Sequence, residues 1–460
     1  MKKFSAALAV FVAVLGMGAA TASADNITWG VNDDAGKYEK GVGPFWSTLL
    51  GVGMTSDTVT LRWDETSASG FEGTDADFVA PSLAAAQAAG VTVTFDVYPR
   101  HSAALADPGN AARFAAWVKS LAQSYPYVTE FVVMNECNTS LFASPQYDGG
   151  QNVSAARCGA FLAATYDQLK SVNPGIFIWG LGLSPRGNPV PTDGSSPRAT
   201  NPVSWLAFLG QWYRQSGRTA PLMDGLDLHP YPIPQNQPFE RGYNDPTSFS
   251  VTNLPRAYQA FYTAFSGTGQ KTVGPGRLPV SLNEVGIQTT PAGASAGTYT
   301  GSENAADQGV DGTTGTEAFQ ASWYTKLVDF TLCDADITKV NIFKLVDESA
   351  LEGWQSGLYY VGYTPKVSAG AFKAEVAKTA GKCPSGSASY FTPSAGPPAA
   401  KPTVKPVKAA AGKSKPTVKP KATAGKSKPT AKAGKGTPNV KAGKTKPTVK
   451  TPKGKAKTKK

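Results

Sequence analysis

The alternation of two kinds of segment along residues 26–380 constrains the fold of this 460-residue chain more than any other feature. Short runs rich in β-branched and aromatic residues are followed by loop residues and then by longer helical patterns, which is typical of repeated βα units around a parallel sheet. We count eight strand candidates: Ile27–Asp33, Thr58–Asp64, Val91–Pro99, Glu130–Glu136, Ile176–Leu183, Gly225–Tyr231, Leu278–Glu284 and Lys339–Asp347. Eight such alternations predict an α/β fold of the (β/α)8 TIM barrel type.

Amphipathic segments lie between these strand candidates. In residues 111–124, Phe114, Trp117, Val118 and Leu121 recur every three to four positions, which places one apolar stripe against a sheet. Comparable segments are Ser154–Val172, Val203–Gln215, Arg256–Phe265, Glu317–Cys333 and Val367–Lys378. An open doubly wound sheet is the alternative, but the glycine-rich phosphate loop of its nucleotide-binding versions does not follow the first strand.

The two ends of the chain differ in composition from the part between them. Residues 1–24 begin with a basic pair, continue through a short apolar stretch and end in Ala-Ser-Ala, as a secretory signal peptide does. Residues 384–460 consist largely of Pro-, Ala- and Lys-rich repeats that cannot bury a core, so we expect a disordered basic tail. One catalytic domain over residues 25–383 remains, and we expect a secreted monomer without a membrane-spanning segment.

The formal net charge of +12 comes from the tail. Residues 401–460 contain 20 Lys and no acidic residue, which leaves 25 basic and 33 acidic residues in the rest of the chain. The tail could hold the protein to an anionic cell-surface polymer, bind nucleic acid or serve as a solvated linker. We favour surface retention over nucleic acid, because aromatic residues that could stack on bases are absent after Phe391.

The four cysteines form an even set in a chain with a secretory signal, so disulfides are the expected state. Three pairings can be written, and sequence order does not choose among them. We favour Cys137 with Cys158 and Cys333 with Cys383, since each pair would join the end of one predicted element to a later one nearby. A metal site is less well supported, because a CxxC spacing is absent and the chain has only two histidines.

Polar residues at the ends of the strand candidates are expected to meet, because all carboxyl ends of a parallel barrel open on one face. Two of these ends carry a glutamate directly after an asparagine, at Asn135-Glu136 and at Asn283-Glu284. Cleaving an acetal requires an acid that protonates the leaving oxygen and a second carboxylate that attacks or stabilises the anomeric carbon. Two glutamates on opposite strands of a barrel meet that requirement.

With the motifs VVMNE and PVSLNE at these two ends, the chain resembles glycoside hydrolase clan A, the barrel enzymes of families 5 and 39 among them. The resemblance implies that Glu136 is the acid/base, next to a substrate-binding Asn135, and that Glu284 is the nucleophile. It further implies that Arg62 supports the nucleophile and that His229 and Tyr231, in LDLHPYP, line the site.

The resemblance has two departures. Cys137 stands where the clan commonly has proline, and the eighth strand lacks the tryptophan on which sugars stack in many members. Trp354, several residues later, is a candidate replacement, and Trp63 is a second candidate stacking platform. Either tryptophan could instead belong to the hydrophobic packing of the barrel.

The preferred hypothesis is a retaining hydrolase that cleaves a β-glycosidic bond of a carbohydrate and needs no metal and no organic cofactor. A barrel that binds cell-surface glycans without cleaving them is the alternative. A metal-dependent hydrolase would need more ligands than two histidines provide. Residues 288–316, rich in Gly, Thr, Ala and Ser, form either a flexible lid or a surface insertion. The sugar and the linkage depend on loop shape and stay open.

Overall fold

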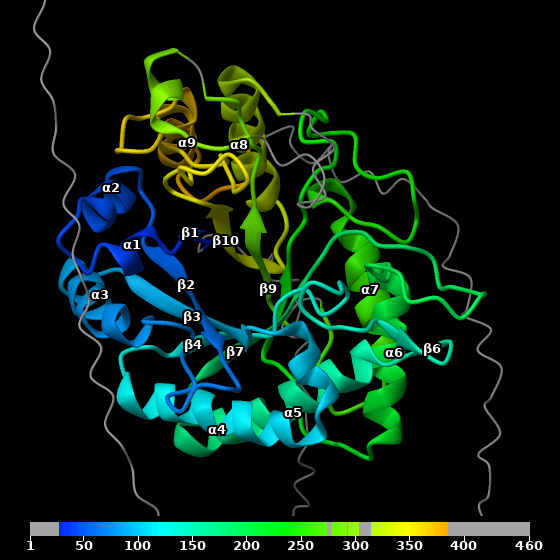
Figure 1. The fold of residues 1–460 in the computed structure, drawn as a ribbon. Helices are drawn as coiled ribbons and strands as arrows, with labels where there is room; N and C mark the ends of the chain where they lie inside the picture. The colour runs from blue at the N-terminus through cyan, green and yellow to red at the C-terminus, as the bar shows by residue number, and fades with distance from the viewer. Residues whose placement is uncertain (1–26, 274–277, 292, 303–313, 385–460) are drawn as a thin grey trace, which may run out of the picture. The chain divides into compact units, whose positions relative to one another are not determined.

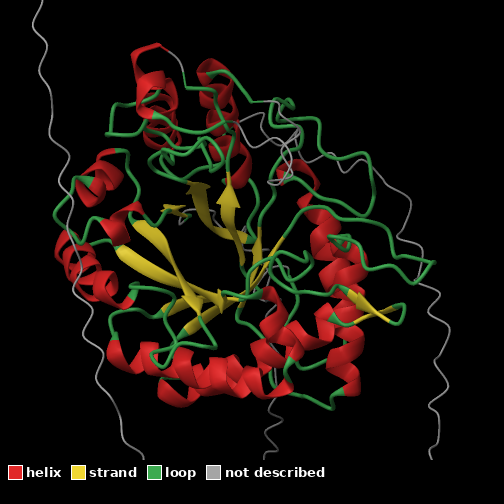
Figure 2. Ribbon diagram, viewed as in Figure 1, coloured by secondary structure: helices red, strands yellow, loops and turns green. Residues whose placement is uncertain are grey.

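The computed structural model describes residues 27–273, 278–291, 293–302 and 314–384. Eight parallel strands close into a barrel in the order β1-β10-β9-β8-β7-β4-β3-β2 (Figures 1 and 2). They are β1 (Thr28–Asn32), β2 (Ser56–Trp63), β3 (Thr92–Pro99), β4 (Glu130–Val133), β7 (Phe177–Leu183), β8 (Gly225–Leu228), β9 (Val280–Val285) and β10 (Ile337–Phe343). A two-stranded hairpin, β5 (Tyr147–Asp148) and β6 (Gln151–Asn152), lies outside the barrel sheet. The predicted (β/α)8 barrel is confirmed.

Helices surround the strands, as the red ribbons outside the yellow arrows of Figure 2 show. The helices are α1 (Ala35–Tyr38), α2 (Phe45–Gly51), α3 (Ala76–Ala89), α4 (Pro108–Ser124), α5 (Ser154–Val172), α6 (Pro202–Gln215), α7 (Leu254–Phe265), α8 (Glu317–Thr331) and α9 (Val367–Thr379). Short 3-10 turns cover Ser102–Ala106, Val251–Asn253 and Gly293–Thr298. None of the helices in the described ranges is both long and apolar enough to cross a membrane.

The alternation of side chains along the strands separates two environments. Phe95 on β3 is fully buried and packs edge-on against Tyr125 and Phe131, in the layer between strands and helices. Thr58 on β2 instead donates a hydrogen bond to Asn283 on β9, at 2.9 Å between Oγ1 and Oδ1, although these strands are not neighbours in the sheet. Such a contact crosses the barrel, so the interior is polar beneath the strand ends and the apolar core lies outside it.

All six helix candidates named from the sequence are present, and their ends differ by a few residues. The apolar stripe of α4 is buried as expected, with Phe114, Trp117, Val118 and Leu121 in the core. Helix α3 was not among the candidates: it contains Pro81, which usually signals the end of a helix, and its many alanines give a weak apolar stripe.

Both favoured disulfides are present, Cys137–Cys158 and Cys333–Cys383. The first joins the segment after β4 to α5, and the second joins the loop after α8 to the segment after α9. The predicted signal peptide lies outside the described residues, as does the tail from residue 385 on. Of the predicted lid, residues 292 and 303–313 also lie outside them; the remainder is tied to the β10 loop, with Thr300 N donating to Ser349 O at 2.9 Å.

Candidate active site

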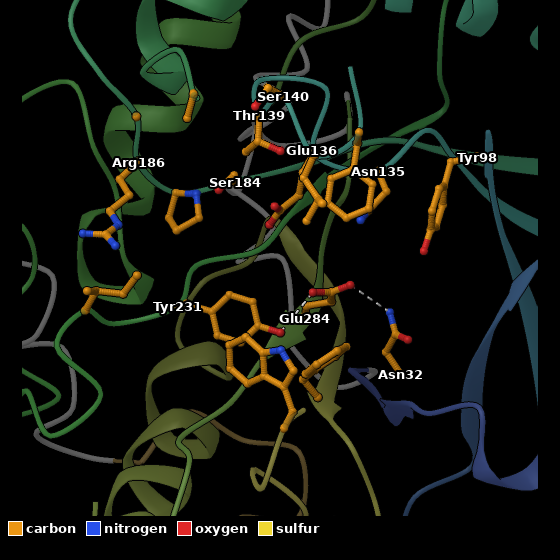
Figure 3. A pocket seen from close by; sticks show the side chains of 18 of the residues that line it. Asn32, Tyr98, Asn135, Glu136, Thr139, Ser140, Ser184, Arg186, Tyr231 and Glu284 are labelled. Atoms are coloured by element: carbon orange, nitrogen blue, oxygen red, sulfur yellow. Dashed lines mark hydrogen bonds between the residues drawn. The ribbon is translucent and has the colours of Figure 1, made fainter. Parts of the chain in front are cut away.

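A pocket of about 920 Å³ opens at the carboxyl ends of the barrel strands (Figure 3). All eight barrel strands, or the residues directly after them, contribute to its lining. In sequence order, one from each strand or from the loop after it, these residues are Asn32, Arg62, Tyr98, Glu136, Ser184, Tyr231, Glu284 and Lys344. The sequence-based expectation that polar strand ends converge on one face therefore describes the actual pocket.

Glu136 reaches the pocket because β4 ends early. The strand stops at Val133, since Met134 and Glu136 adopt positive φ angles of 70° and 38°, a region that side-chain-bearing residues rarely occupy. Glu136 N donates to Gly182 O at 3.0 Å, and the disulfide of Cys137 holds the next residue. Such conformations cost about 1 to 3 kcal/mol each and persist where surrounding contacts enforce them, often at functional sites.

Glu284 lies near the end of β9 and faces the same pocket. Tyr231 donates its hydroxyl proton to Glu284 Oε2 at 3.0 Å, and Asn32 Nδ2 lies 3.4 Å from Oε1 (dashed lines in Figure 3). Its neighbour Asn283 accepts hydrogen bonds from Thr58 and from Asn341 inside the barrel, at 2.9 and 2.8 Å. The contacts with Tyr231 and Asn32 limit the rotation of the Glu284 carboxylate, and those of Asn283 fix the strand beside it.

His229 lies between the two glutamates and is fully buried. Its Nδ1 is 3.2 Å from Glu136 Oε1 and 3.4 Å from Glu284 Oε2. One oxygen of each carboxylate and this ring nitrogen all lie within 4.8 Å of one another. The two carboxylates therefore share one cleft, in agreement with their expected opposition across the barrel mouth.

Electrostatics at this cluster depend on burial and on the three neighbouring charges. Burial raises the pKa of Glu284, while the adjacent His229 and the Tyr231 hydrogen bond act in the opposite direction. Burial alone would lower the pKa of His229, but Glu284, Asp227 and Glu136 outweigh it, and the pKa lies well above the usual value. The acidic neighbours therefore favour the protonated form of the imidazole, against the effect of burial.

Three further residues predicted for the site line the pocket. Asn135 lies beside Glu136, and Tyr231 bonds Glu284. Trp354 packs against Tyr231, with ring centroids 4.9 Å apart, and against Phe343 at 5.2 Å. Trp354 thus lies in the pocket lining, in the loop after β10, the eighth strand of the barrel, which is compatible with its proposed replacement of the missing tryptophan.

Arg62 lines the pocket without the contact expected for it. Its Nε pairs with Glu72 in the loop after β2, and its side chain is 44% exposed. A contact between Arg62 and Glu284 does not appear among the described residues. Because the guanidinium pairs with Glu72 instead, the expected support of the nucleophile by Arg62 is wrong.

Trp63 is not a stacking platform. Only 4% of it is exposed, and its ring packs edge-on against Phe114 of α4 at 5.8 Å. Because neighbouring residues of a strand point to opposite faces, Trp63 must face the helices if Arg62 faces the pocket. Trp63 therefore belongs to the hydrophobic packing of the barrel, which was the alternative to a stacking role.

Two residues of the cluster were not selected from the sequence. Asn32 was recognised as a strand end but not assigned to the site, and Asp227 was overlooked. Asp227 precedes His229 by two positions and is fully buried, so both side chains share one strand face. That spacing of two within LDLHPY was the signal that could have found it.

The loops after β4 and β7 form one wall of the pocket, next to Glu136. Asn138 is fully buried and joins them: its Nδ2 donates to Ser184 O at 3.1 Å and to Thr200 O at 3.2 Å. Ser184 N donates to Asn138 Oδ1 at 3.1 Å. Residues 139–142 and 184–188 are thereby held as a continuous lining.

Within the part of the chain that the structure describes, two side-chain groups have the composition of a metal site, and in both the donor atoms contact protein partners. In the first, His229 Nδ1 faces both carboxylates as a proton donor would. In the second, Asp64 accepts from Thr66 and Arg100, and His101 bonds Glu65. We assign a metal to neither group.

The fold and the pocket define a (β/α)8 barrel with a paired-carboxylate site at the carboxyl ends of its strands. No family model matches the sequence, and a search of curated proteins finds no match. The structure is similar to a family 39 glycoside hydrolase from Bacteroides cellulosilyticus WH2, at a TM-score of 0.48 and 13% identity over 76% of this chain. This chain spans 64% of that protein's chain.

Two further solved structures are similar at the same level. A GH5_18 protein from Streptomyces cattleya, in complex with GlcNAc, has a TM-score of 0.49 and 15% identity, covering 77% of this chain and 80% of that one. The GH53 catalytic domain from Ignisphaera aggregans has a TM-score of 0.49 and 14% identity, covering 76% of this chain and 96% of that one. The function is therefore argued from the pocket itself.

Proposed function

We propose that the protein is a secreted, retaining glycoside hydrolase that cleaves O-glycosidic bonds, of the β type, in a poly- or oligosaccharide. The observation that carries the proposal is the pair of carboxylates in one cleft, with an oxygen of Glu136 within 4.8 Å of an oxygen of Glu284. Retaining enzymes have their two carboxyl groups about 5 to 5.5 Å apart, whereas inverting enzymes leave about 6.5 to 9.5 Å for a water molecule.

In the proposed reaction, Glu136 gives its proton to the glycosidic oxygen while Glu284 attacks the anomeric carbon. The bond to the leaving group breaks as the bond to Glu284 Oε forms, which yields a covalent glycosyl-enzyme. Glu136, now ionised, takes a proton from water, whose oxygen displaces Glu284 from the anomeric carbon. The cycle ends with both glutamates in their starting states and with the anomeric configuration retained.

The surrounding residues support these roles. Tyr231 donates to Glu284 and keeps one carboxylate oxygen directed at the pocket. Trp354 offers an aromatic face beside Tyr231 on which a sugar ring can stack. The wall built from the loops after β4 and β7 lies beside Glu136, where the leaving group would be held.

The two disulfides suit an oxidising compartment, which agrees with secretion. We further propose that the lysine-rich tail retains the enzyme at an anionic cell-surface polymer. A disulfide-bonded carbohydrate-active domain with a basic attachment segment would act close to the cell that exports it.

The test is a panel of aryl β-glycosides and polysaccharides with the mature protein. Glu284→Gln should abolish turnover, and Glu136→Ala should lower it by about 10²- to 10⁴-fold and recover with azide. Glu240→Gln is a matched control, because Glu240 pairs with Lys326 away from the pocket lining. NMR of the first product should show the anomeric configuration of the substrate.

Full activity in Glu284→Gln, or a first product of inverted configuration, would contradict the mechanism. Binding of glycans without any product across the panel would instead favour the non-catalytic glycan-binding barrel.

A further inference from the structure

The cation beside the candidate nucleophile is a histidine, and the structure contains a second buried group that faces it. His229 and Asp227 are both fully buried on β8 and the residues that follow it. Asp227 Oδ2 lies 3.8 Å from His229 Nε2, on the side of the ring opposite to Glu136 and Glu284. The ring therefore has carboxylates at both of its nitrogens.

We propose that Asp227 is a positioning residue that holds His229 as a doubly protonated imidazolium between Glu136 and Glu284. In this arrangement His229, rather than an arginine, supplies the positive charge beside the nucleophile. The inference rests on the proposed glycosidase function for its catalytic meaning, but the state of the imidazole is a property of the protein alone.

The donor and acceptor pattern supports the assignment. Nδ1 lies 3.2 Å from Glu136 Oε1 and 3.4 Å from Glu284 Oε2. The ionised Glu284 carboxylate can only accept, and protonated Glu136 still accepts through its carbonyl oxygen, so a proton on Nδ1 satisfies both contacts. Nε2 faces the Asp227 carboxylate at 3.8 Å, an ion-pair distance rather than a hydrogen bond, and Ser281 is the other polar side chain that acts on this carboxylate. An unpaired carboxylate buried at this depth would be costly, and a proton on Nε2 offsets that cost.

The site is shaped to keep the ring in place. Gly182 has a φ of 47°, and a Cβ on it would lie 3.0 Å from His229 Nε2 and 3.0 Å from Asn135 Oδ1. A side chain at residue 182 would therefore push the imidazole away from Asp227. Glycine at this position allows the backbone of β7 to approach the ring closely.

Among the described residues, the groups that raise the pKa of His229 are acidic, and two cations, Lys339 and Lys344, act on the neighbouring Asp227 and Glu284. Glu136 follows β4, Asp227 is on β8, Glu284 is on β9, and Asp96 on β3 completes the set. Burial raises the pKa of Asp96 well above its usual value, and the neighbouring Glu284 adds to the rise. Burial therefore favours the neutral form of Asp96, and Glu136, Asp227 and Glu284 are the acidic groups that contact the His229 ring.

The experiment uses the fact that the chain has two histidines, His101 and His229. With ¹⁵N-labelled histidine, long-range ¹H–¹⁵N correlation spectra of the full chain between pH 5 and 9 resolve the protonation state of each ring. His101→Gln assigns the signals. Wild-type His229 should have both nitrogens protonated throughout the neutral range, whereas Asp227→Asn should lower its titration midpoint by at least about one pH unit.

Glu65→Gln is the matched control. Glu65 Oε1 lies 3.0 Å from Nδ1 of His101, a histidine whose side chain is 46% exposed, so the variant removes a carboxylate beside the other imidazole of the chain. This variant should leave the His229 midpoint unchanged. A neutral His229 in the wild-type protein at pH 7 would overturn the proposal without any variant, so a folding defect in Asp227→Asn leaves it testable. An unchanged His229 midpoint in folded Asp227→Asn would overturn the role of Asp227.

Kinetics separate this role from a purely structural one. In Asp227→Asn, the alkaline limb of kcat should move to the His229 midpoint found by NMR, whereas a packing defect would lower kcat equally at all pH values. Failure of the glycan panel would refute the glycosidase function and leave the histidine titration intact. A neutral His229 in an active enzyme would refute only the inference.

Discussion

Single residues at the strand ends carry most of the argument about chemistry. Glu136 and Glu284 were selected from the sequence because each ends a strand after an asparagine, and both face the pocket. Arg62 and Trp63, neighbours on β2, show how much one position matters. One is at the pocket rim and the other in the core, because side chains alternate across a strand.

Tyr231→Phe tests the electrostatics at the nucleophile. The hydroxyl stabilises ionised Glu284 and so lowers a pKa that burial raises. Removing it should raise the pKa of Glu284 further, so that the carboxylate is protonated at a higher pH and the acid limb of kcat/KM moves upward. The measurement is the pH dependence of kcat/KM from pH 4 to 8.

Tyr213→Phe is the control for that experiment. Tyr213 is equally buried and donates to Ala220 O at 2.9 Å, remote from the pocket lining. Losing its hydroxyl should cost about 1 kcal/mol of stability and leave the acid limb in place. An acid limb that does not move in Tyr231→Phe would contradict the assigned hydrogen bond.

Elements and their ends decide how the residues are presented. Strand β4 stops three residues before the sequence pattern predicts, since Met134 has a φ of 70°, and this turn directs Glu136 toward the cleft. Strand β10 likewise ends at Phe343 because Lys344 has a φ of 83°. Such left-handed positions arise from tertiary contacts, so periodicity locates the strand and misses its last residues.

Asn138→Ala tests the wall formed by the loops after β4 and β7. The change removes three hydrogen bonds of a fully buried side chain. We expect a loss of about 1 to 3 kcal/mol in the free energy of unfolding. The KM for oligosaccharides should rise more than the KM for aryl glycosides, which have small leaving groups.

Asn173→Ala is the matched change outside the wall. Asn173 caps an exposed turn before β7, where its Oδ1 accepts from Gly175 N at 2.9 Å. KM should be unchanged for both kinds of substrate. Equal effects of Asn138→Ala on both substrates would argue against a leaving-group subsite.

At the scale of the whole molecule, the charge of the chain is divided between its parts. Residues 401–460 carry 20 Lys and no acid, so the formal net charge of +12 does not describe the barrel. A basic segment attracts anionic polymers over a distance that salt shortens, from a Debye length of about 10 Å at 0.1 M to about 3 Å at 1 M.

Surface retention predicts salt-dependent release. Washing producing cells with NaCl from 0.1 to 1 M should release increasing amounts of the full-length protein into the supernatant, measured by immunoblot and by activity. A variant with glutamine at the tail lysines should appear in the supernatant at every salt concentration. Retention that persists at all ionic strengths would exclude an electrostatic attachment.

The order of strands and helices and the two glutamates could be predicted from the sequence, because periodicity and strand-end motifs are local properties. The disulfide pairing was one of three that the sequence allowed, and the structure decided it. Which groups face each other was not, since it depends on strand register and on the height of each residue in the closed barrel. The tertiary structure decided that His229 lies between Asp227 and Glu284. It also decided that Arg62 pairs with Glu72. Contacts across a barrel join residues distant in sequence, and no pattern within one segment contains them.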